Sequence, residues 1–478
     1  MPGWAGLHTD LTTWLIMAGL IACWMGSIRL VPGWAREGWP ALLKSLFGFV
    51  WLGFAVDILL RFCMLSYNAV EWGSGSQRLA ALPLNTVNTA VAYCALFWVS
   101  LCLGFAFAVR RATPGPLAHL CVLTPEFAYA AAVPTAALAS IAFYLIEGQT
   151  SVPVEWITPI ALLANLYMIP AAVVWWDHFR RPGPKWRIGA VHIVVLLPAV
   201  VRSWRSPYRE NLAPLLLVPL IAALSAGIRP SLRKLVPAAV ASFLACTLLI
   251  SSYREIKWQN ARVEEVAYEL RDTSISNWIA GDWARPMSRF HAFDSLLMTV
   301  FLVPSLEPHS GREVLISPFI QGFVPRFIYA DKQAGDQGVH FGERIWAFDD
   351  PAARLSRTGS IAPSMPGDLF DAGGIPFLAA GGLIWGILLG LIDGWKRHLP
   401  AFCAAAITAQ VATHCAMSVE RDFGHTLAAF IQAMLVLALS AGIVALSRRA
   451  VGTAVPFKHS LDPARKFAGG DGLTGMVR

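Results

Sequence analysis

"GGIPFLAAGGLIWGILLGLI", residues 373–392, is a run of 20 residues that contains no charged side chain. Lipid offers no hydrogen-bond partner to a backbone amide or carbonyl group, so a chain that crosses a bilayer satisfies these groups within a helix. Such a helix needs roughly 20 apolar residues to span the hydrocarbon layer. The run therefore predicts a transmembrane helix and places the chain in the helical membrane class.

The composition of the whole chain points to the same class. The chain has 478 residues, of which 56% are hydrophobic and 14% are charged, and its mean hydropathy is +0.54. A soluble chain carries about 25% charged residues. We therefore expect an all-α protein that crosses the membrane several times. Apolar runs predict eleven spans, near residues 11–30, 40–60, 87–109, 126–146, 157–176, 188–201, 211–228, 235–252, 373–392, 400–417 and 425–446.

Clusters of Lys and Arg lie at the ends of these spans, and cytoplasmic loops are the ones normally enriched in them. With an outer N-terminus, all six clusters fall on the cytoplasmic side. The large segment 253–371 then lies outside, together with the loops 66–86, 147–156, 202–210 and 418–424. The six clusters are Arg29/Arg36, Arg110/Arg111, Arg180/Arg181/Lys185/Arg187, Arg229/Arg233/Lys234, Lys396/Arg397 and Arg448/Arg449.

One outer loop departs from the charge rule. "RSWRSPYRE", residues 202–210, is basic although the count places it outside. Either the span at 188–201 does not cross, since it is short for about 30 Å of hydrocarbon, or the loop is kept basic to bind an anionic ligand. Both interpretations stay open at the level of the sequence.

These features divide the chain into four segments. We expect an N-terminal bundle over 1–252, a large outer segment over 253–371 with short amphipathic and re-entrant helices, C-terminal spans over 372–447 and a disordered cytoplasmic tail over 448–478. The outer segment carries 12 Lys and Arg residues against 16 Asp and Glu, and the rest of the chain carries a net charge of +12. Basic residues that flank apolar spans indicate membrane orientation, so we do not expect nucleic-acid binding.

The cysteines argue against a disulfide framework or a zinc site. The chain has eight, none of them lies in the outer segment, and no two form a CxxC pair. Both kinds of site need paired or clustered cysteines. We expect no metal and no cofactor.

An outer segment this long between two helices is usually functional. Within it, "DWARPMSRFHAFDSLLMTVFLV", residues 282–303, opens with a helix-start signal, because Asp282 precedes Pro286. The apolar end, 295–303, is too short to cross a bilayer and predicts a re-entrant or interfacial helix. Two pairs share faces of this helix, Arg285 with Arg289 and His291 with Asp294.

A second stretch of the outer segment, "FVPRFIYADK", residues 323–332, has the apolar content of a buried strand. Pro325 and Arg326 interrupt it. Arginines among aromatic residues suit a sugar ring beside a phosphate, since ring faces stack and guanidinium binds phosphate through two hydrogen bonds. An interfacial aromatic belt with an arginine that reaches the headgroups is the alternative.

Two blocks, residues 322–347 and 359–390, resemble the bacterial oligosaccharide repeat-unit polymerases, the Wzy-type O-antigen and exopolysaccharide polymerases. In that family a late outer loop carries a Pro-Arg-aromatic element, a basic residue and a Gly-aromatic stretch, followed by a small-polar segment with an acidic residue and an aromatic or Gly entry to the next helix. The matching positions are Pro325-Arg326-Phe327, Lys332, Phe341-Gly342, Ser360/Ser364 with Asp368 or Asp371, and Gly373-Gly374.

The resemblance implies a GT-C-like helical architecture in the bacterial inner membrane, with a periplasmic large loop and a cytoplasmic C-terminus. It implies transfer of a glycan from undecaprenyl diphosphate to the end of another lipid-linked repeat unit. Its implied partners are this lipid-linked glycan, membrane lipid, and a flippase and chain-length regulator of the same pathway. An early outer loop lacks the DxD or ExD pattern of metal-dependent membrane glycosyltransferases, so we expect a metal-independent reaction.

The chemistry of such a transfer selects the candidate residues. A diphosphate leaving group needs cationic donors, and an acceptor hydroxyl needs a general base or an oriented hydrogen-bond acceptor. For the cationic role we expect Arg326 first, then Lys332, Arg289 and Arg285, with Arg205 and Arg421 from other outer loops binding the diphosphate. For the base the candidates are Asp368, Asp371 and His291.

Other ionisable residues favour structural roles. In "SVERDFGH", residues 418–425, charges crowd between two helices and either cap or bridge them, or contribute Arg421 or His425 to the diphosphate site. Inside the predicted spans, Lys44 and His192 are expected to be structural, and Asp57 to pair with Arg61 four residues on.

Three other functions stay open. An O-antigen ligase moves glycan from the same lipid to the lipid A core, and lipid-linked repeat units alone would not be its substrate. A flippase or polysaccharide-export component would show repeated halves or helices broken at the midplane. A membrane peptidase of the exosortase type would use an outer Cys with Arg and His, for which Cys415, Arg421 and His425 are the candidates.

Overall fold

A computed structural model of the chain describes residues 7–66, 79, 82–113, 124–147, 154–183, 188–205, 209–231, 233, 237, 292–324, 328, 341, 344 and 363–450. Every regular element within these ranges is a helix. The prediction of an all-helical membrane protein is confirmed to that extent.

Seven helical segments are long and apolar enough to cross a membrane, and each coincides with a predicted span. They are Leu11–Leu30, Leu46–Ser66, Leu84–Arg111, Pro125–Ile146, Pro159–Arg180, Met365–Lys396 and Phe423–Gly442. The predicted spans at 188–201, 211–228 and 400–417 are shorter apolar helices, and the one at 235–252 lies outside the described residues.

The first half of the chain contains α1 (Leu11–Ser27), η1 (Ile28–Leu30), α2 (Trp34–Glu37), α3 (Trp39–Lys44), α4 (Leu46–Phe54), the π-helix η2 (Ala55–Leu60), α5 (Arg61–Ser66), α7 (Leu84–Arg111), α8 (Pro125–Glu147), α9 (Val154–Ala164), η4 (Asn165–Tyr167), α10 (Met168–Arg180), α11 (Ala190–Val194), α12 (Leu197–Arg205) and α13 (Arg209–Ser225). The second half contains α18 (Ala292–Leu302), α19 (Glu313–Phe323), α22 (Met365–Lys396), α23 (Ala401–Ala416) and α24 (Phe423–Ala450).

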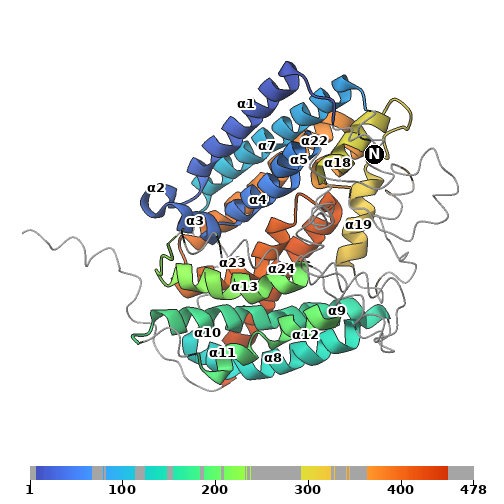
Figure 1. Cartoon of the computed structure of the whole chain (residues 1–478). Coiled ribbons are helices and arrows are strands. Elements are labelled where there is room, and N and C mark those ends of the chain that lie inside the picture. The colour runs from blue at the N-terminus through green and yellow to red at the C-terminus, as the bar shows by residue number, and fades with distance from the viewer. Residues whose placement is uncertain are drawn as a thin grey trace, which may run out of the picture.

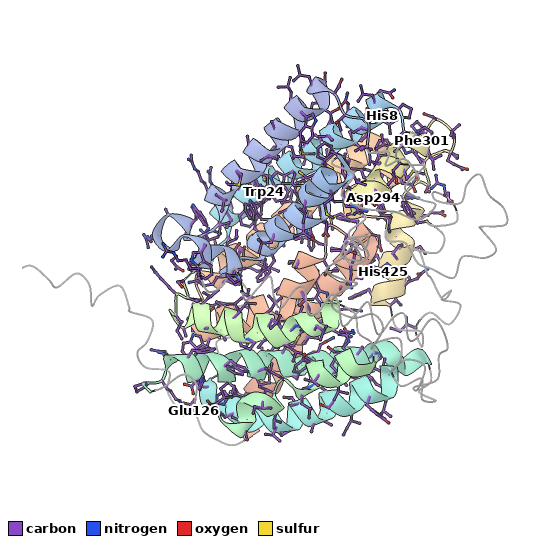
Figure 2. All side chains as sticks on the ribbon, viewed as in Figure 1. His8, Trp24, Glu126, Asp294, Phe301 and His425 are labelled. Atoms are coloured by element: carbon purple, nitrogen blue, oxygen red, sulfur yellow. The ribbon has the colours of Figure 1, made fainter. Side chains whose placement is uncertain are left out.

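The helices form two groups with α23 and α24 between them (Figure 1). One group contains α1, α4, α5, α7, α18 and α22, and the other contains α8 to α13. Figure 2 shows His8, Asp294, Phe301 and His425 toward one end of the molecule and Glu126 toward the other. The short helices α18 and α19 therefore share an end of the bundle with the start of α24.

Helix α22 packs closely along α7 because glycine recurs on one of its faces. Gly382, Gly386, Gly390 and Gly394 follow one another at intervals of four residues, which places them on one side of a helix. A Cβ atom on Gly386 would overlap the carbonyl oxygen of Leu101 in α7. Such small residues let two membrane helices approach through their backbones, and here they fix the position of α22.

The first part of α22 belongs to the predicted outer segment. The helix begins at Met365, ahead of the apolar run, with the Ser364 side chain accepting a hydrogen bond from the Gly367 amide at 3.2 Å. It breaks at Gly373 and Gly374, where Gly374 has a φ of 71°. Glycine adopts this left-handed conformation without steric cost. The break tilts a buried first segment, 365–372, against the spanning part of the helix.

The predicted span at 40–60 is divided at Ser45. Helix α3 ends at Lys44 and the crossing helix starts at Leu46. The carboxylate of Asp393, from the far end of α22, accepts hydrogen bonds from the Leu46 amide at 3.0 Å and the Phe47 amide at 3.3 Å. Lys396 lies 2.7 Å from the same carboxylate. A carboxylate at a helix N-terminus is stabilising, so Asp393 sets the start of α4.

The short helix expected near 295–303 is present as α18, and all but two of its residues are buried, against α22, α7 and η2. The strand expected from residue 323 is wrong at its start, because Phe323 is the last residue of helix α19. Ile328 is exposed rather than buried. Packing of α19 on α24 overrides the local preference for a strand.

Candidate functional site

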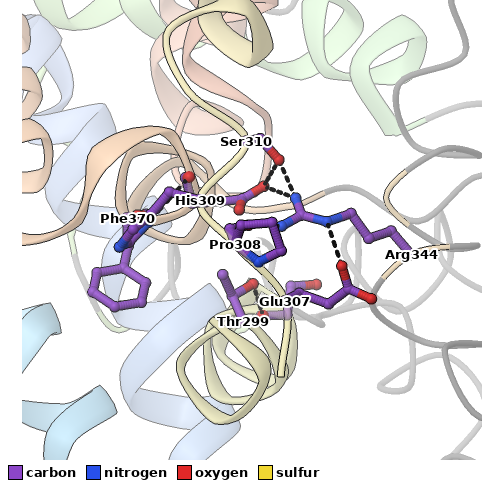
Figure 3. A network of polar contacts seen from close by, with 9 residues as sticks. Thr299, Glu307, Pro308, His309, Ser310, Arg344 and Phe370 are labelled. Carbon is purple, nitrogen blue, oxygen red and sulfur yellow. Dashed lines mark hydrogen bonds and ion pairs between the residues drawn. The ribbon is translucent and has the colours of Figure 1, made fainter. Parts of the chain in front are cut away.

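A network of polar contacts surrounds Asp371 at the break of α22 (Figure 3). Its Oδ2 accepts hydrogen bonds from Ser310 Oγ at 2.8 Å and from Arg344 Nη1 at 2.6 Å. The Ser310 amide also donates to the Asp371 carbonyl oxygen at 3.0 Å. The segment between α18 and α19 is thereby fixed to the first part of α22.

Arg344 makes several of these contacts with one guanidinium group. It also donates to the Pro308 carbonyl oxygen and to Ser310 Oγ, and its Nε lies 3.9 Å from Glu307 Oε2. The side chain of Arg344 is 26% exposed, so part of it is open to solvent. Because guanidinium carries five N–H donors in a fixed plane, a held arginine of this kind can offer the exposed donors to an anion.

His309 is exposed and lies in the chain between Pro308 and Ser310, two of the residues that bind Arg344. Its Nδ1 lies 3.1 Å from the Phe370 carbonyl oxygen and 3.3 Å from the Asp371 carbonyl oxygen. A carbonyl oxygen only accepts, so Nδ1 carries the proton and Nε2 of the neutral ring is left as a proton acceptor. Nε2 lies beside Gly374, since a Cβ on that glycine would be in van der Waals contact with it at 3.5 Å.

The second carboxylate oxygen of Asp371 has an open position. Asp371 is 2% exposed, and its Oδ1 is buried without a hydrogen-bond partner among the described residues. Buried polar atoms in native proteins nearly always have a partner. A buried water molecule would satisfy this oxygen.

Asp368, one turn before Asp371 in α22, belongs to a second group of polar contacts, which joins α22 to residues 419–425. It is 2% exposed, and its Oδ2 accepts a hydrogen bond from the Phe423 amide at 2.9 Å. Nearby, Met365 donates its amide to the Val419 carbonyl oxygen at 3.0 Å. The start of α22 is therefore bound to the connection between α23 and α24.

Asp422, which is buried, and His425, which is half-buried, complete this second group. The Asp422 carboxylate accepts a hydrogen bond from the His425 amide at 2.7 Å and lies 2.8 Å from His425 Nδ1. The capping and bridging role expected for residues 418–425 is confirmed for this pair. Burial lowers the pKa of the Arg421 guanidinium, while the Asp422 carboxylate raises it and the positive charge of Arg202 lowers it.

Helix α19 approaches the same group. A Cβ on Gly322 would lie 3.6 Å from His425 Cδ2, and Gln432 Nε2 donates to the Gly322 carbonyl oxygen at 2.5 Å. The end of α19 thus lies beside His425. Val324, the last described residue of this stretch, follows directly from that end.

The predicted site residues fall into separate groups, and several lie outside the described residues. Asp368 lies with Asp422 and His425, and Asp371 lies with Arg344 and Ser310. The predicted loop at 202–210 is shorter, because α12 extends to Arg205 and α13 starts at Arg209, and the Arg205 side chain is not described. Arg326, Lys332, Arg285, Arg289 and His291 lie outside the described residues.

The sequence interpretation missed Arg344, His309, Ser310 and Glu307. Arg344 follows Phe341-Gly342 in the block 322–347, so an extra cation there was a usable signal. "EPHS", residues 307–310, is a polar step directly after the apolar end of the short helix, and it marks where the chain turns back.

Two further observations bear on the site. The described residues contain no group of three or more His, Cys, Asp or Glu side chains arranged to hold a metal ion. Comparison with protein-family models, with curated proteins and with solved structures gives no match.

Proposed function

We propose that this chain is a glycosyltransferase of the bacterial inner membrane that polymerises lipid-linked oligosaccharide repeat units, with a GT-C-like architecture and its large loop in the periplasm. One observation carries the proposal. An anchored, partly exposed guanidinium and an oriented, exposed imidazole meet at one end of a bundle of apolar helices. These features match a lipid-linked glycan: the guanidinium can bind the diphosphate, the imidazole can accept a proton from a sugar hydroxyl, and the apolar helices place both beside the lipid that holds the polyprenyl chain.

Arg344 is the described candidate for the cationic role. As the glycosyl bond to undecaprenyl diphosphate breaks, negative charge grows on the leaving oxygen, and preorganised donors aimed at that charge stabilise it. Asp371 holds the Arg344 guanidinium at 2.6 Å. Arg326 remains the candidate from the neighbouring stretch that follows α19, with Arg421 as a further cation.

His309 and Asp371 are the candidates on the acceptor side. The acceptor hydroxyl oxygen bonds to the anomeric carbon, the carbon–oxygen bond to the diphosphate breaks, and the hydroxyl proton passes to His309 Nε2. A general base must accept that proton within hydrogen-bond reach. Asp371 holds Ser310 and Arg344 in place for this step. Asp368 fits a supporting role, since it binds the Phe423 amide.

Deletion of the gene tests the proposed function. The surface glycan of the deletion strain should run as single repeat units in place of a ladder on a gel. Complementation with His309→Ala or Arg344→Ala should leave the single units, while the matched control His398→Ala, an exposed histidine at the far end of α22, should restore the ladder. An unchanged ladder in the deletion strain would contradict the proposal.

The same gel separates a ligase from a polymerase. Loss of a ligase leaves a polymer of normal length on its lipid carrier, because chain growth precedes transfer. Loss of a polymerase leaves no polymer in either place. A full ladder that is found only on the lipid carrier would therefore replace polymerisation by ligation as the function.

A further inference from the structure

Helix α18 carries a single ionisable residue, and that residue is in a fully buried ion pair. Asp294 binds Arg61 of α5 through two parallel hydrogen bonds, Nε to Oδ1 at 3.0 Å and Nη2 to Oδ2 at 2.9 Å. Both side chains are 0% exposed. The sequence predicted a pairing of Arg61 with Asp57, which stays a prediction, and gave no sign of this bidentate contact between residues 233 positions apart.

The other contacts of α18 are weakly directional. Its buried side chains include Phe293, Leu296, Leu297 and Met298, and apolar burial depends on area rather than on direction. A bidentate Arg–carboxylate pair adds geometric specificity. A shift of α18 by one turn, about 5.4 Å, would separate the two buried charges, and breaking a buried ion pair is strongly unfavourable. The pair therefore selects one depth for this helix.

The depth of α18 determines where the site residues lie. On one side, α18 contacts the first turn of α22, since a Cβ on Gly367 would lie 3.5 Å from Thr299 Oγ1 and 3.6 Å from Leu296 Cα. At its end, the chain continues directly into the segment that carries His309 and Ser310. Figure 2 shows Asp294 at the same end of the bundle as Phe301.

We propose that Arg61 and Asp294 are positioning residues: their buried ion pair sets the depth of α18 and so aligns His309 and Ser310 with Asp371 and Arg344. Their effect passes through α18 and the segment that follows it. The alignment itself stands independently of the reaction, and only the activity measurement below rests on the proposed function.

A disulfide probe measures the alignment directly. The Ser310 amide binds the Asp371 carbonyl oxygen at 3.0 Å, so Ser310→Cys with Asp371→Cys should form a disulfide, which requires Cα atoms within about 7 Å. The probe is placed in the native background, in Arg61→Met/Asp294→Leu, and in the control Glu37→Gln/Lys44→Met, which removes an ion pair from the other end of the bundle. Mass spectrometry of the oxidised, detergent-purified protein quantifies the crosslinked peptide.

We expect the crosslink in the native and control backgrounds and its loss in Arg61→Met/Asp294→Leu, with helical content unchanged. Apolar replacement of a buried ion pair normally preserves a fold. The exchanged pair Arg61→Asp/Asp294→Arg should recover the crosslink. A crosslink at the native rate in the apolar variant, or its absence in a folded exchanged pair, would overturn the proposal. Loss of the fold in both variants would overturn it too, because the pair would then serve folding.

An activity measurement adds the functional consequence. Chain elongation by Arg61→Met/Asp294→Leu should fall about a hundredfold, as for a misplacement of roughly 1 Å at a reacting centre. If the native protein fails to elongate lipid-linked units, the proposed function fails while the crosslink result stands. If the native protein elongates and the apolar variant elongates equally well, the positioning role fails alone.

Discussion

Nδ1 of His309 lies 3.1 Å from the carbonyl oxygen of Phe370, although 61 positions separate the two residues in the chain. This contact joins the segment after α18 to the first part of α22. It orients the imidazole so that Nε2 faces away from the contact, beside Gly374. An exposed ring whose Nδ1 is held by backbone carbonyl oxygens suits a group that acts on a substrate better than a core residue.

Replacement of His309 should affect activity without affecting stability. Because the ring is exposed, His309→Ala should leave the thermal unfolding midpoint within the error of the native protein. Loss of a general base should slow elongation by about 10²–10⁴-fold. Elongation rates on purified protein check this, with His398→Ala as the control. A His309→Ala protein that elongates at the native rate would remove His309 from the mechanism.

Replacement of Arg344 should lower both the stability and the activity of the protein. Arg344→Ala removes the cation that Asp371, 2% exposed, faces at 2.6 Å. The loss of charged hydrogen bonds should cost about 1.5–3 kcal/mol of unfolding free energy, and loss of a preorganised donor should slow the reaction about 10²–10³-fold. Arg344→Ala/Asp371→Asn should regain stability but not activity. Activity regained by the double variant would contradict the assigned role.

The glycine face of α22 predicts a specific loss of stability. Gly386→Ala places a methyl group on the Leu101 carbonyl oxygen, and overpacking of this kind costs about 1–3 kcal/mol. Gly19→Ala in α1 is the matched control, since a Cβ there meets no atom within 4 Å, and it should stabilise by up to about 1 kcal/mol. Thermal unfolding in detergent measures both. Equal midpoints for the two variants would refute close packing of α22 on α7.

Loss of the buried Asp393–Lys396 ion pair should destabilise the protein more than loss of the half-exposed Glu37–Lys44 pair. The Asp393 carboxylate caps α4 and faces Lys396 in a buried position, so Asp393→Ala should cost about 3–5 kcal/mol by leaving Lys396 without its counter-charge. Glu37→Ala breaks a half-exposed pair with Lys44 and should cost less than about 1 kcal/mol. Chemical denaturation compares the two. A smaller loss for Asp393→Ala than for Glu37→Ala would be inconsistent with the described cap.

Much of the fold follows from the length of the apolar runs alone. Seven apolar runs of sufficient length became seven long helices, because lipid leaves the backbone no alternative. The role of Gly382, Gly386, Gly390 and Gly394 as a packing face was not predicted and became clear only from their contacts with α7. The start of α22 at Met365 was not predicted, because Asp368 and Asp371 were assigned to the outer segment. Their burial in a helix depends on contacts with Phe423 and Arg344, which are distant in sequence.

The site was harder to predict, since its contacts join distant segments. Helical spacing relates Arg61 to the acidic residue four positions before it, but it gives no sign of the bidentate contact with Asp294. Phe323 has a preference for strands, yet it is the last residue of α19, because that helix packs on α24. Helical spacing records local neighbours only, and nothing in a single sequence records pairs brought together by packing of separate helices.

The most direct test of the central claim is elongation by the purified protein with lipid-linked repeat units as its only substrate. Native protein and His398→Ala should convert single units into a ladder of longer lipid-linked products, whereas His309→Ala and Arg344→Ala should leave the single units unchanged. A native protein that forms no longer products from these units, or variants at His309 and Arg344 that both form the ladder at the native rate, would contradict the account.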